Sequence, residues 1–184
     1  MRHTKTLLAA AAVLTLGLSG AAMAADPMVG GAPMFASKNI IQNAVNSKDH
    51  TTLVAAVKAA GLVQTLEGPG PFTVFAPTNE AFAALPPGTV DNLLKPANKA
   101  TLVKILTYHV VSGRYDKAVL MHDLQAAPGG KVSLKTVEGE SLIVWQKNGT
   151  LMITDAKGGT AAVTIPDVFQ SNGTIMVVNK VLMP

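Results

Sequence analysis

The sequence has no cysteine, few aromatic residues and few charged ones. Aromatic side chains make up 4% and charged side chains 14% of its 184 residues. Without cysteine, no disulfide supports the fold, and no thiolate is available as a nucleophile or a metal ligand. The fold must therefore rest on its own hydrophobic core. A chain of this length can bury enough apolar surface for such a core.

The basic residues are not grouped along the chain. The formal net charge is +4, yet no run of Lys or Arg occurs, and the few aromatic residues are not interleaved with basic ones. A nucleic-acid groove usually shows one or both of these patterns. The sequence therefore predicts no nucleic-acid partner. An anionic polysaccharide stays open as a partner, although the linear charge pattern does not point to one.

No apolar run reaches the roughly 20 residues that cross a bilayer. The run over residues 7–18 follows the basic residues Arg2 and Lys5 and precedes the small residues around Met23. This order is typical of a secretory signal peptide. We therefore expect a signal peptide over residues 1–24, export, and no membrane span in the mature chain. Residues 25–36, with two Pro and two Gly, are expected to form a flexible leader before a single domain over 37–184.

Helical periodicity dominates the first half of this domain. Apolar residues recur at helical spacing over residues 39–46, 53–60 and 98–106. Asp49 or Thr51 is expected to cap the second of these helices, and Gly61 to end it in a left-handed turn. Thr78 is expected to cap a further short helix.

Short runs of β-branched residues dominate the second half, after about Pro128. One such run also lies earlier, over residues 72–76, and the later runs cover residues 132–136, 142–145, 151–153, 161–165 and 174–178. These runs predict strands, and Pro166 is expected to end the fourth of the later ones. The pair Asn148-Gly149 predicts a hairpin turn. Helices followed by strands indicate an α+β fold.

Three segments together resemble the fasciclin domain family. They are Phe72 to Phe82 (FTVFAPTNEAF), Tyr108 to Val111 (YHVV) and Asn172 to Leu182 (NGTIMVVNKVL). The resemblance extends over about residues 37–184. It implies an α+β fold: a wedge-shaped β-sandwich with a layer of helices from the N-terminal half. It also implies an extracellular or cell-surface setting and an adhesive role without enzyme chemistry.

The resemblance also suggests residues that could contact a partner. In adhesive animal relatives, an Asp followed by an aliphatic residue before the last signature is proposed to contact integrins. Asp167 and Val168 hold that place here, although Ile165 stands where those relatives have an acid. The competing interpretation is that Pro166-Asp167 forms a turn between strands, and the sequence favours that turn.

Tyr108 and His109 form the second candidate pair. A tyrosine combines an apolar body with a polar tip and can anchor a partner. The alternative is that His109 is buried and hydrogen-bonded at a helix-to-strand junction, and the sequence favours this structural role. A buried histidine that titrates would make the domain sensitive to pH.

Other sites find little support in the sequence. His50, His109 and His122 lack the spacing that places two metal ligands on one helix face. No Gly-x-Ser-x-Gly segment is present. The sequence therefore predicts no catalytic residue, no metal and no cofactor.

Two functions follow as hypotheses. The first is an exported interaction module, located in the periplasm, at the cell surface or outside the cell, that binds a surface or matrix protein or a polysaccharide. The second is a binder of a small apolar ligand, held in a groove between helices and sheet.

Overall fold

The computed structural model describes residues 26–184, so the expected signal peptide lies outside the described residues. Its helices are α1 (Ile40–Ala44), α2 (Thr51–Ala60), α3 (Val63–Glu67), α4 (Asn79–Ala83), α5 (Thr89–Leu93), α6 (Lys99–Tyr108) and α7 (Lys117–Ala126), with short 3-10 turns η1 (Lys48–His50), η2 (Pro96–Asn98) and η3 (Pro128–Gly130). Its strands are β1 (Met28–Val29), β2 (Ala32–Pro33), β3 (Phe72–Pro77), β4 (Val110–Ser112), β5 (Lys131–Lys135), β6 (Ser141–Lys147), β7 (Thr150–Thr154), β8 (Thr160–Gln170) and β9 (Gly173–Val178).

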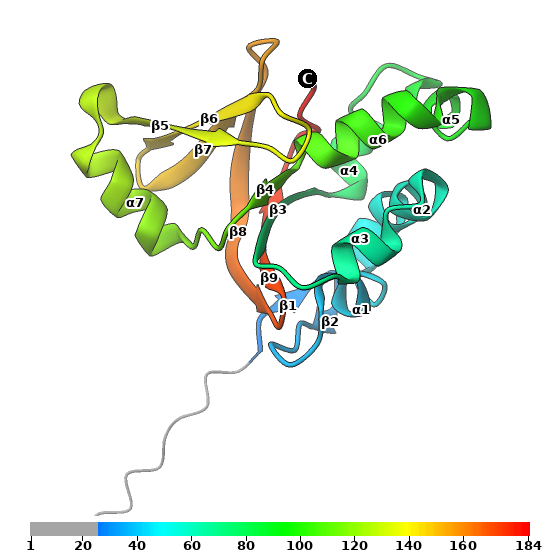
Figure 1. Ribbon diagram of the computed structural model, residues 1–184, viewed down its shortest axis with the longest axis horizontal. Helices are drawn as coiled ribbons and strands as arrows, with labels where there is room; N and C mark the ends of the chain where they lie inside the picture. The colour runs from blue at the N-terminus through cyan, green and yellow to red at the C-terminus, as the bar shows by residue number, and fades with distance from the viewer. Residues whose placement is uncertain (1–25) are drawn as a thin grey trace, which may run out of the picture.

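One seven-stranded sheet organises the domain, in the order β4-β3-β9-β8-β7-β6-β5. Strands β3 and β9 pair in parallel, and the other neighbours pair antiparallel. A bridge between Val111 and Thr136 brings the two ends of the sheet together, so the sheet curls until it nearly closes. Helices α1 to α6 lie on one side of it and α7 on the other (Figure 1). This confirms the predicted α+β fold with its fasciclin-like wedge.

Strands β3 and β9 separate two hydrophobic cores. Val74 of β3 and Ile175 of β9 face the core beneath α1 to α6, whereas Phe75 and Met176 face the core beneath α7. Successive side chains of a strand point to opposite faces, so a strand buried on both faces reads as a continuous apolar run. This explains why both family signatures are apolar at nearly every position of their strands.

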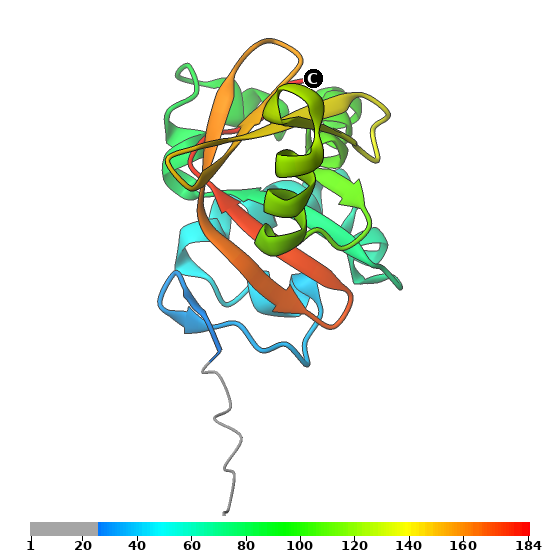
Figure 2. The same cartoon turned by 90° about the vertical axis from the view of Figure 1, so that its left-hand side faces the viewer.

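Helix α7 was not predicted from the sequence. Its apolar positions are sparse, and only Leu120 and Leu124 are buried along it. These two side chains pack on Leu134, Leu142 and Val144 of the β5–β6 hairpin. Figure 2 shows the helix lying across the sheet on the face opposite the other helices. The helical layer from the N-terminal half therefore covers one face, and α7 supplies the cover of the second core.

The segment expected to be a flexible leader contains a small hairpin. Strands β1 and β2 pair with each other, and Val29 and Met34 are 3% and 2% exposed within the first core. The amide of Lys48 donates to the Gly30 carbonyl at 3.2 Å, which ties the hairpin to the domain. Pro and Gly suggested a loop, but two buried apolar side chains are enough to fix these residues on the core.

Two of the three predicted helix ends are confirmed, and one predicted cap is wrong. Gly61 ends α2 in the left-handed conformation, and the Thr78 hydroxyl accepts from the Ala81 amide at the start of α4, both as predicted. The cap expected from Asp49 or Thr51 is wrong, because neither side chain caps α2. Instead Asn79 Oδ1 accepts from the Thr52 amide at 3.0 Å. The cap thus comes from a residue 27 positions away in the chain.

Asn172 has a similar role at the other signature. Its Oδ1 accepts from the Ile40 amide at 3.0 Å, and its Nδ2 donates to the carbonyls of Leu66 and Gly68. One side chain thereby joins α1 and the end of α3 to the β8–β9 turn. Both signature asparagines serve backbone groups that are distant in sequence.

Candidate functional site

Strand β8 continues through Pro166, contrary to the prediction that this proline ends the strand. Its pairing with β9 shifts register between Val163 and Ile165 and again between Ile165 and Val168. Asp167 lies within the second shift and has a φ of 59°. Aspartate tolerates this left-handed conformation better than most residues. The expected Pro-Asp turn is therefore a bulge within one long strand, which lets the sheet bend.

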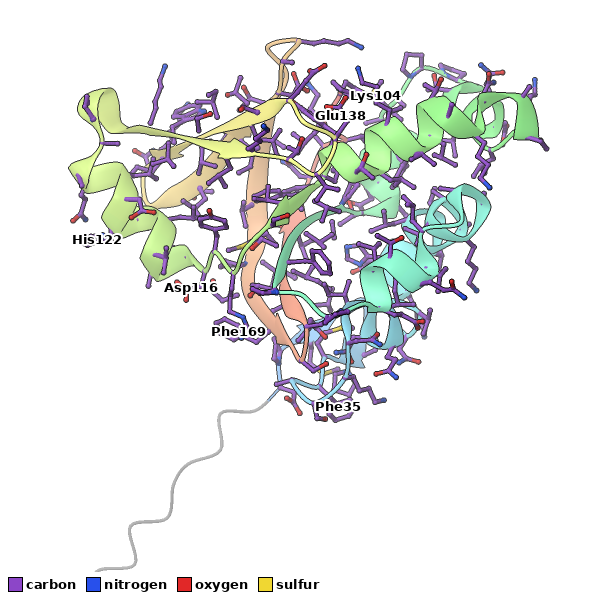
Figure 3. The ribbon with its side chains drawn as sticks, in the orientation of Figure 1. Phe35, Lys104, Asp116, His122, Glu138 and Phe169 are labelled. Carbon is purple, nitrogen blue, oxygen red and sulfur yellow. The ribbon has the colours of Figure 1, made fainter. Side chains whose placement is uncertain are left out.

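The bulge turns Asp167 toward the beginning of α7. Its Oδ1 accepts from the Lys117 amide at 2.6 Å, while Asp116 Oδ1 accepts from the Val119 amide at 2.8 Å. Free amides at a helix start favour a negative charge, so two carboxylates serve this end of α7. Figure 3 places Asp116 at that end of the helix. Val168, the second residue of the candidate pair, is 0% exposed and belongs to the first core.

Replacing Asp167 by alanine is expected to lower the free energy of unfolding by about 1–2 kcal/mol, the usual value of a helix cap. Alanine removes the acceptor and also fits the positive φ less well. Asp167→Asn keeps an acceptor and tolerates that φ, so it should retain most of the stability. Urea unfolding of both variants measures this difference, and equal losses would contradict the capping role.

Tyr108 is completely buried, with 0% of its surface exposed. Its hydroxyl donates to the Ser141 carbonyl at 3.2 Å and accepts from the Ala156 amide at 2.9 Å. Burial raises the pKa of this phenol, so the hydroxyl keeps its proton. The side chain therefore joins α6 to the turns at both ends of the β6–β7 hairpin, which supports the structural interpretation over partner contact.

His109 is buried next to it, with 2% exposed. Its Nδ1 lies 2.8 Å from the Ile105 carbonyl, which can only accept, so Nδ1 carries the proton. Its Nε2 accepts from the Leu182 amide at 2.9 Å. Burial lowers the pKa of His109 to about 4, although the Ile105 carbonyl and Asp155 oppose this shift. The neutral ring joins the end of α6 to the C-terminal segment, again a role inside the domain.

An apolar cavity of about 50 Å³ lies between helices α1 to α3 and the sheet. Val29, Met34, Ile41, Val57 and Ile175 are among its lining residues. Its volume is well below the roughly 300–1,000 Å³ of typical ligand pockets. The groove expected for an apolar ligand is therefore present only as a small void in this conformation.

His50 also lines the cavity. In the sequence it stood out only as one of three histidines without the spacing of metal ligands. Its Nδ1 lies 2.9 Å from Ser47 Oγ, but Nε2 has no hydrogen-bond partner among the described residues. Burial lowers the pKa of His50, and the Ala76 carbonyl and Asp49 partly offset this effect. The Ala76 carbonyl thus raises the pKa of the His50 ring without forming a hydrogen bond of ordinary geometry to it. A buried unpaired nitrogen in an apolar space is an unusual feature.

The candidate residues do not form one constellation. Tyr108 and His109 stabilise the α6 end, Asp167 lies at the α7 start, and Val168 is in the core. Within residues 26–184, no three His, Asp or Glu side chains lie close enough to share a metal ion. None of the helices in that range combines the length and apolar composition needed to cross a membrane.

Comparison with known sequences gives a family and several relatives. The family model for the fasciclin domain matches residues 48–184. Protein sll1483 of Synechocystis is 48% identical over 145 residues, which cover 79% of this chain and 73% of that protein. Protein sll1735 of the same organism is 41% identical over 147 residues, which cover 79% of this chain and 97% of that protein.

Comparison with solved structures gives the same fold. The structure of a FAS1 domain pair from the insect cell adhesion molecule fasciclin I superposes with a TM-score of 0.71 and 20% sequence identity. The superposition covers 80% of this chain and 51% of that chain, so this chain spans about half of the insect pair. At this identity the likeness concerns the fold alone.

Proposed function

This chain belongs to the fasciclin domain family, and from that premise we propose that it is an exported interaction module supporting cell adhesion or cell–cell association. The observation that carries the proposal is the family match over residues 48–184. The fold neighbour from an insect cell adhesion molecule is consistent with it. The partner would be a surface or matrix protein or a polysaccharide, met in the periplasm, at the cell surface or outside the cell.

The arrangement of the domain favours binding over catalysis. His109, whose pKa burial lowers to about 4, is hydrogen-bonded at both ring nitrogens. A general base needs a free nitrogen within reach of a substrate. Both nitrogens of His109 are occupied by backbone groups of the domain, so His109 is not available as a general base. Together with the family match, this favours a binding role, and we propose no enzymatic activity.

Of the four residues first considered for partner contact, Asp167 is the one that is partly exposed. It lies beside a shallow hollow of about 150 Å³ lined by Lys117, Thr164 and Pro166 among others. A bulged strand next to a helix start is a suitable place for a contact, because bulges often redirect side chains at functional surfaces. We therefore propose Asp167 as the first residue to test for contact with an adhesion partner.

Adhesion of cells that lack the gene, complemented by wild-type or Asp167→Asn protein, tests this function. The Asn variant keeps the hydrogen bond to α7 and removes the charge. Asp91→Asn, an exposed acid on α5, is the matched control. We expect the deletion to weaken attachment or aggregation, Asp91→Asn to restore it fully, and Asp167→Asn to restore it only in part. Unchanged adhesion in the deletion strain would overturn the proposal.

A second candidate function is binding of a small apolar ligand, and the cavity beside His50 favours it. The unpaired Nε2 could hold a polar group of a ligand whose apolar body fills the cavity. Val29 and Met34 of the β1–β2 hairpin would have to move outward to make room. Native mass spectrometry of the protein from its own organism is expected to show a bound small molecule, and a bare protein mass in every preparation would exclude this function.

A further inference from the structure

The outward face of strands β5, β6 and β7 is unlike the rest of the sheet. On these strands Leu134, Leu142, Val144, Leu151 and Ile153 point into the core beneath α7. The alternate residues must therefore point away from that core, because strand side chains alternate between the two faces. The outward residues are Lys131, Ser133, Lys135, Ser141, Ile143, Trp145, Lys147, Thr150, Met152 and Thr154.

Trp145 lies near the centre of this outward face. It pairs with Lys131 on one neighbouring strand and with Met152 on the other. Its indole N–H donates to Thr154 Oγ1 at 3.0 Å, which fixes the ring on the sheet. The ring is partly exposed, and together with Lys131, Ile143 and Thr154 it lines an open hollow of about 320 Å³. A hollow of this size falls in the lower range of ligand sites.

The charge on this face has one sign. Lys131, Lys135 and Lys147 are all exposed, and the outward residues of the three strands include no acid. The nearest acids along the chain are Glu138 and Glu140 in the β5–β6 loop and Asp155 directly after β7. Asp155 is buried, and its carboxylate accepts from backbone amides within the domain. Glu138 and Glu140 lie 3.5 and 3.3 Å from the Lys104 ammonium of α6, so their charges are partly balanced. Figure 3 shows Lys104 next to Glu138. The face therefore presents an aromatic ring within a group of lysines.

We propose that this lysine–tryptophan face, defined by Lys131, Lys135, Trp145 and Lys147, binds an acidic polysaccharide. The apolar face of a sugar ring covers the indole, which offers an apolar body next to polar groups. The carboxylate or sulfate groups of the chain meet the lysines, whose charges attract an anionic ligand to the face. A second copy of the domain would place lysines against lysines and is disfavoured. This inference rests on the proposed interaction function and names one partner class for it.

Fluorescence titration tests the proposal directly, because Trp145 is the single tryptophan of the chain. The probes are polygalacturonate, dextran sulfate and neutral dextran of similar length, added to the purified protein. We expect a saturable change in Trp145 emission with at least one acidic chain and none with neutral dextran. Added salt should weaken the binding, since exposed charges are screened over about 8 Å at physiological ionic strength.

Two sets of lysine variants and one tryptophan variant locate the binding. Lys131→Gln, Lys135→Gln and Lys147→Gln together should weaken binding by about tenfold or more, because the attraction of the face is removed. Lys48→Gln, Lys95→Gln and Lys99→Gln remove the same charge from exposed positions on the helical side and should leave affinity nearly unchanged. Trp145→Val, followed by calorimetry, should weaken binding as well while keeping a residue suited to a strand.

The outcomes separate this inference from the proposed function. Equal loss in the two lysine sets would show non-specific charge attraction and overturn the site. An emission change that depends on protein concentration alone would show self-association and also overturn it. If no acidic chain binds while the gene still supports adhesion, the site fails and the proposed function stands. If acidic chains bind at this face while gene deletion leaves adhesion intact, the site stands and the proposed function fails.

Discussion

Replacing His109 by alanine is expected to lower the free energy of unfolding by about 3–5 kcal/mol, in the range for large buried side chains. The change leaves the Ile105 carbonyl and the Leu182 amide without their partner, and it opens a cavity beside β3. Each buried group left unpaired adds to the loss. His122 is exposed on α7, so His122→Ala should change stability little. Chemical unfolding at pH 7 measures both, and similar values would contradict the role of His109.

The same histidine should make the domain less stable in acid. An unfolded histidine has a pKa near 6.5, whereas burial lowers that of His109 to about 4 in the folded state. Below pH 6.5, His109 binds a proton in the unfolded chain but stays neutral in the folded domain until the pH nears 4. The free energy of unfolding therefore falls as the pH falls from 6.5 toward 4. The expected loss from this group is about 3 kcal/mol. His50, whose pKa is also lowered, adds a loss of the same sign.

Unfolding measured from pH 7 to pH 4 in wild type and in His109→Gln isolates this contribution. Glutamine does not titrate and offers an acceptor for the Leu182 amide. Carboxylates titrate alike in both proteins, so the difference between the two curves reports His109. We expect a clearly flatter curve for the variant, and parallel curves would exclude His109 as the acid-sensitive group.

Gly173→Ala is expected to lower the free energy of unfolding by about 3 kcal/mol or more, at or above the upper end for overpacked sites. A Cβ at this position would overlap the carbonyl oxygen of Phe72 and lie 3.1 Å from Ile40 Cδ1. Gly173 begins β9 and Phe72 begins β3, and these parallel strands are central to the sheet. Neither the β3 backbone nor the β9 backbone can move away without disturbing their pairing, and both strands pack against the two cores.

Gly149 provides a matched comparison, because it also stands between Asn and Thr. A Cβ there would meet no atom within 4 Å, but Gly149 has a φ of 78°. Gly149→Ala should therefore cost only the conformational strain, about 1 kcal/mol. Thermal and urea unfolding measure the stability loss in both variants. The loss in Gly173→Ala reports a steric clash, and the loss in Gly149→Ala reports the strain of a positive φ. If Gly149→Ala were the more damaging change, the close approach of β3 and β9 would not be the constraint.

Several elements of the fold could be predicted because their signals are local. The helix over 53–60 was found from its apolar spacing, and its end from Gly61. The Asn148-Gly149 hairpin was predicted because that turn needs two residues with positive φ, and both have it. The strand of the first signature was likewise read from its β-branched and aromatic residues. In each case the determining physics lies within a few residues.

The missed elements depend on distant partners. Helix α7 buries only two leucines, so its periodicity is weak, and its cover comes from the β5–β6 hairpin. Pro166 was predicted to end a strand, but β8 continues because a bulge absorbs the proline and redirects Asp167 to α7. The cap of α2 was assigned to neighbours, whereas Asn79 supplies it from another helix. Sequence spacing carries no information about such contacts.

The candidate residues show the same division. The sequence favoured a buried, hydrogen-bonded His109, and the contacts with Ile105 and Leu182 support that interpretation. It did not single out His50 or Trp145. A lone histidine near a helix start and a tryptophan in a strand are common, and only the cavity and the lysine–tryptophan face make them notable.

By itself the sequence determined the α+β class and the strands of both signatures, because apolar periodicity and turn residues act over short distances. The family was indicated separately, by the resemblance of three segments to the fasciclin domain. The tertiary structure decided that two identical Asn-Gly-Thr tripeptides have different roles. Asn148-Gly149-Thr150 is a turn that needs positive φ, while Asn172-Gly173-Thr174 contains a glycine that only contact with Phe72 requires. It also gathered Lys131, Lys135 and Lys147, scattered in the sequence, on one face. That gathering follows from strand pairing, which joins residues far apart along the chain.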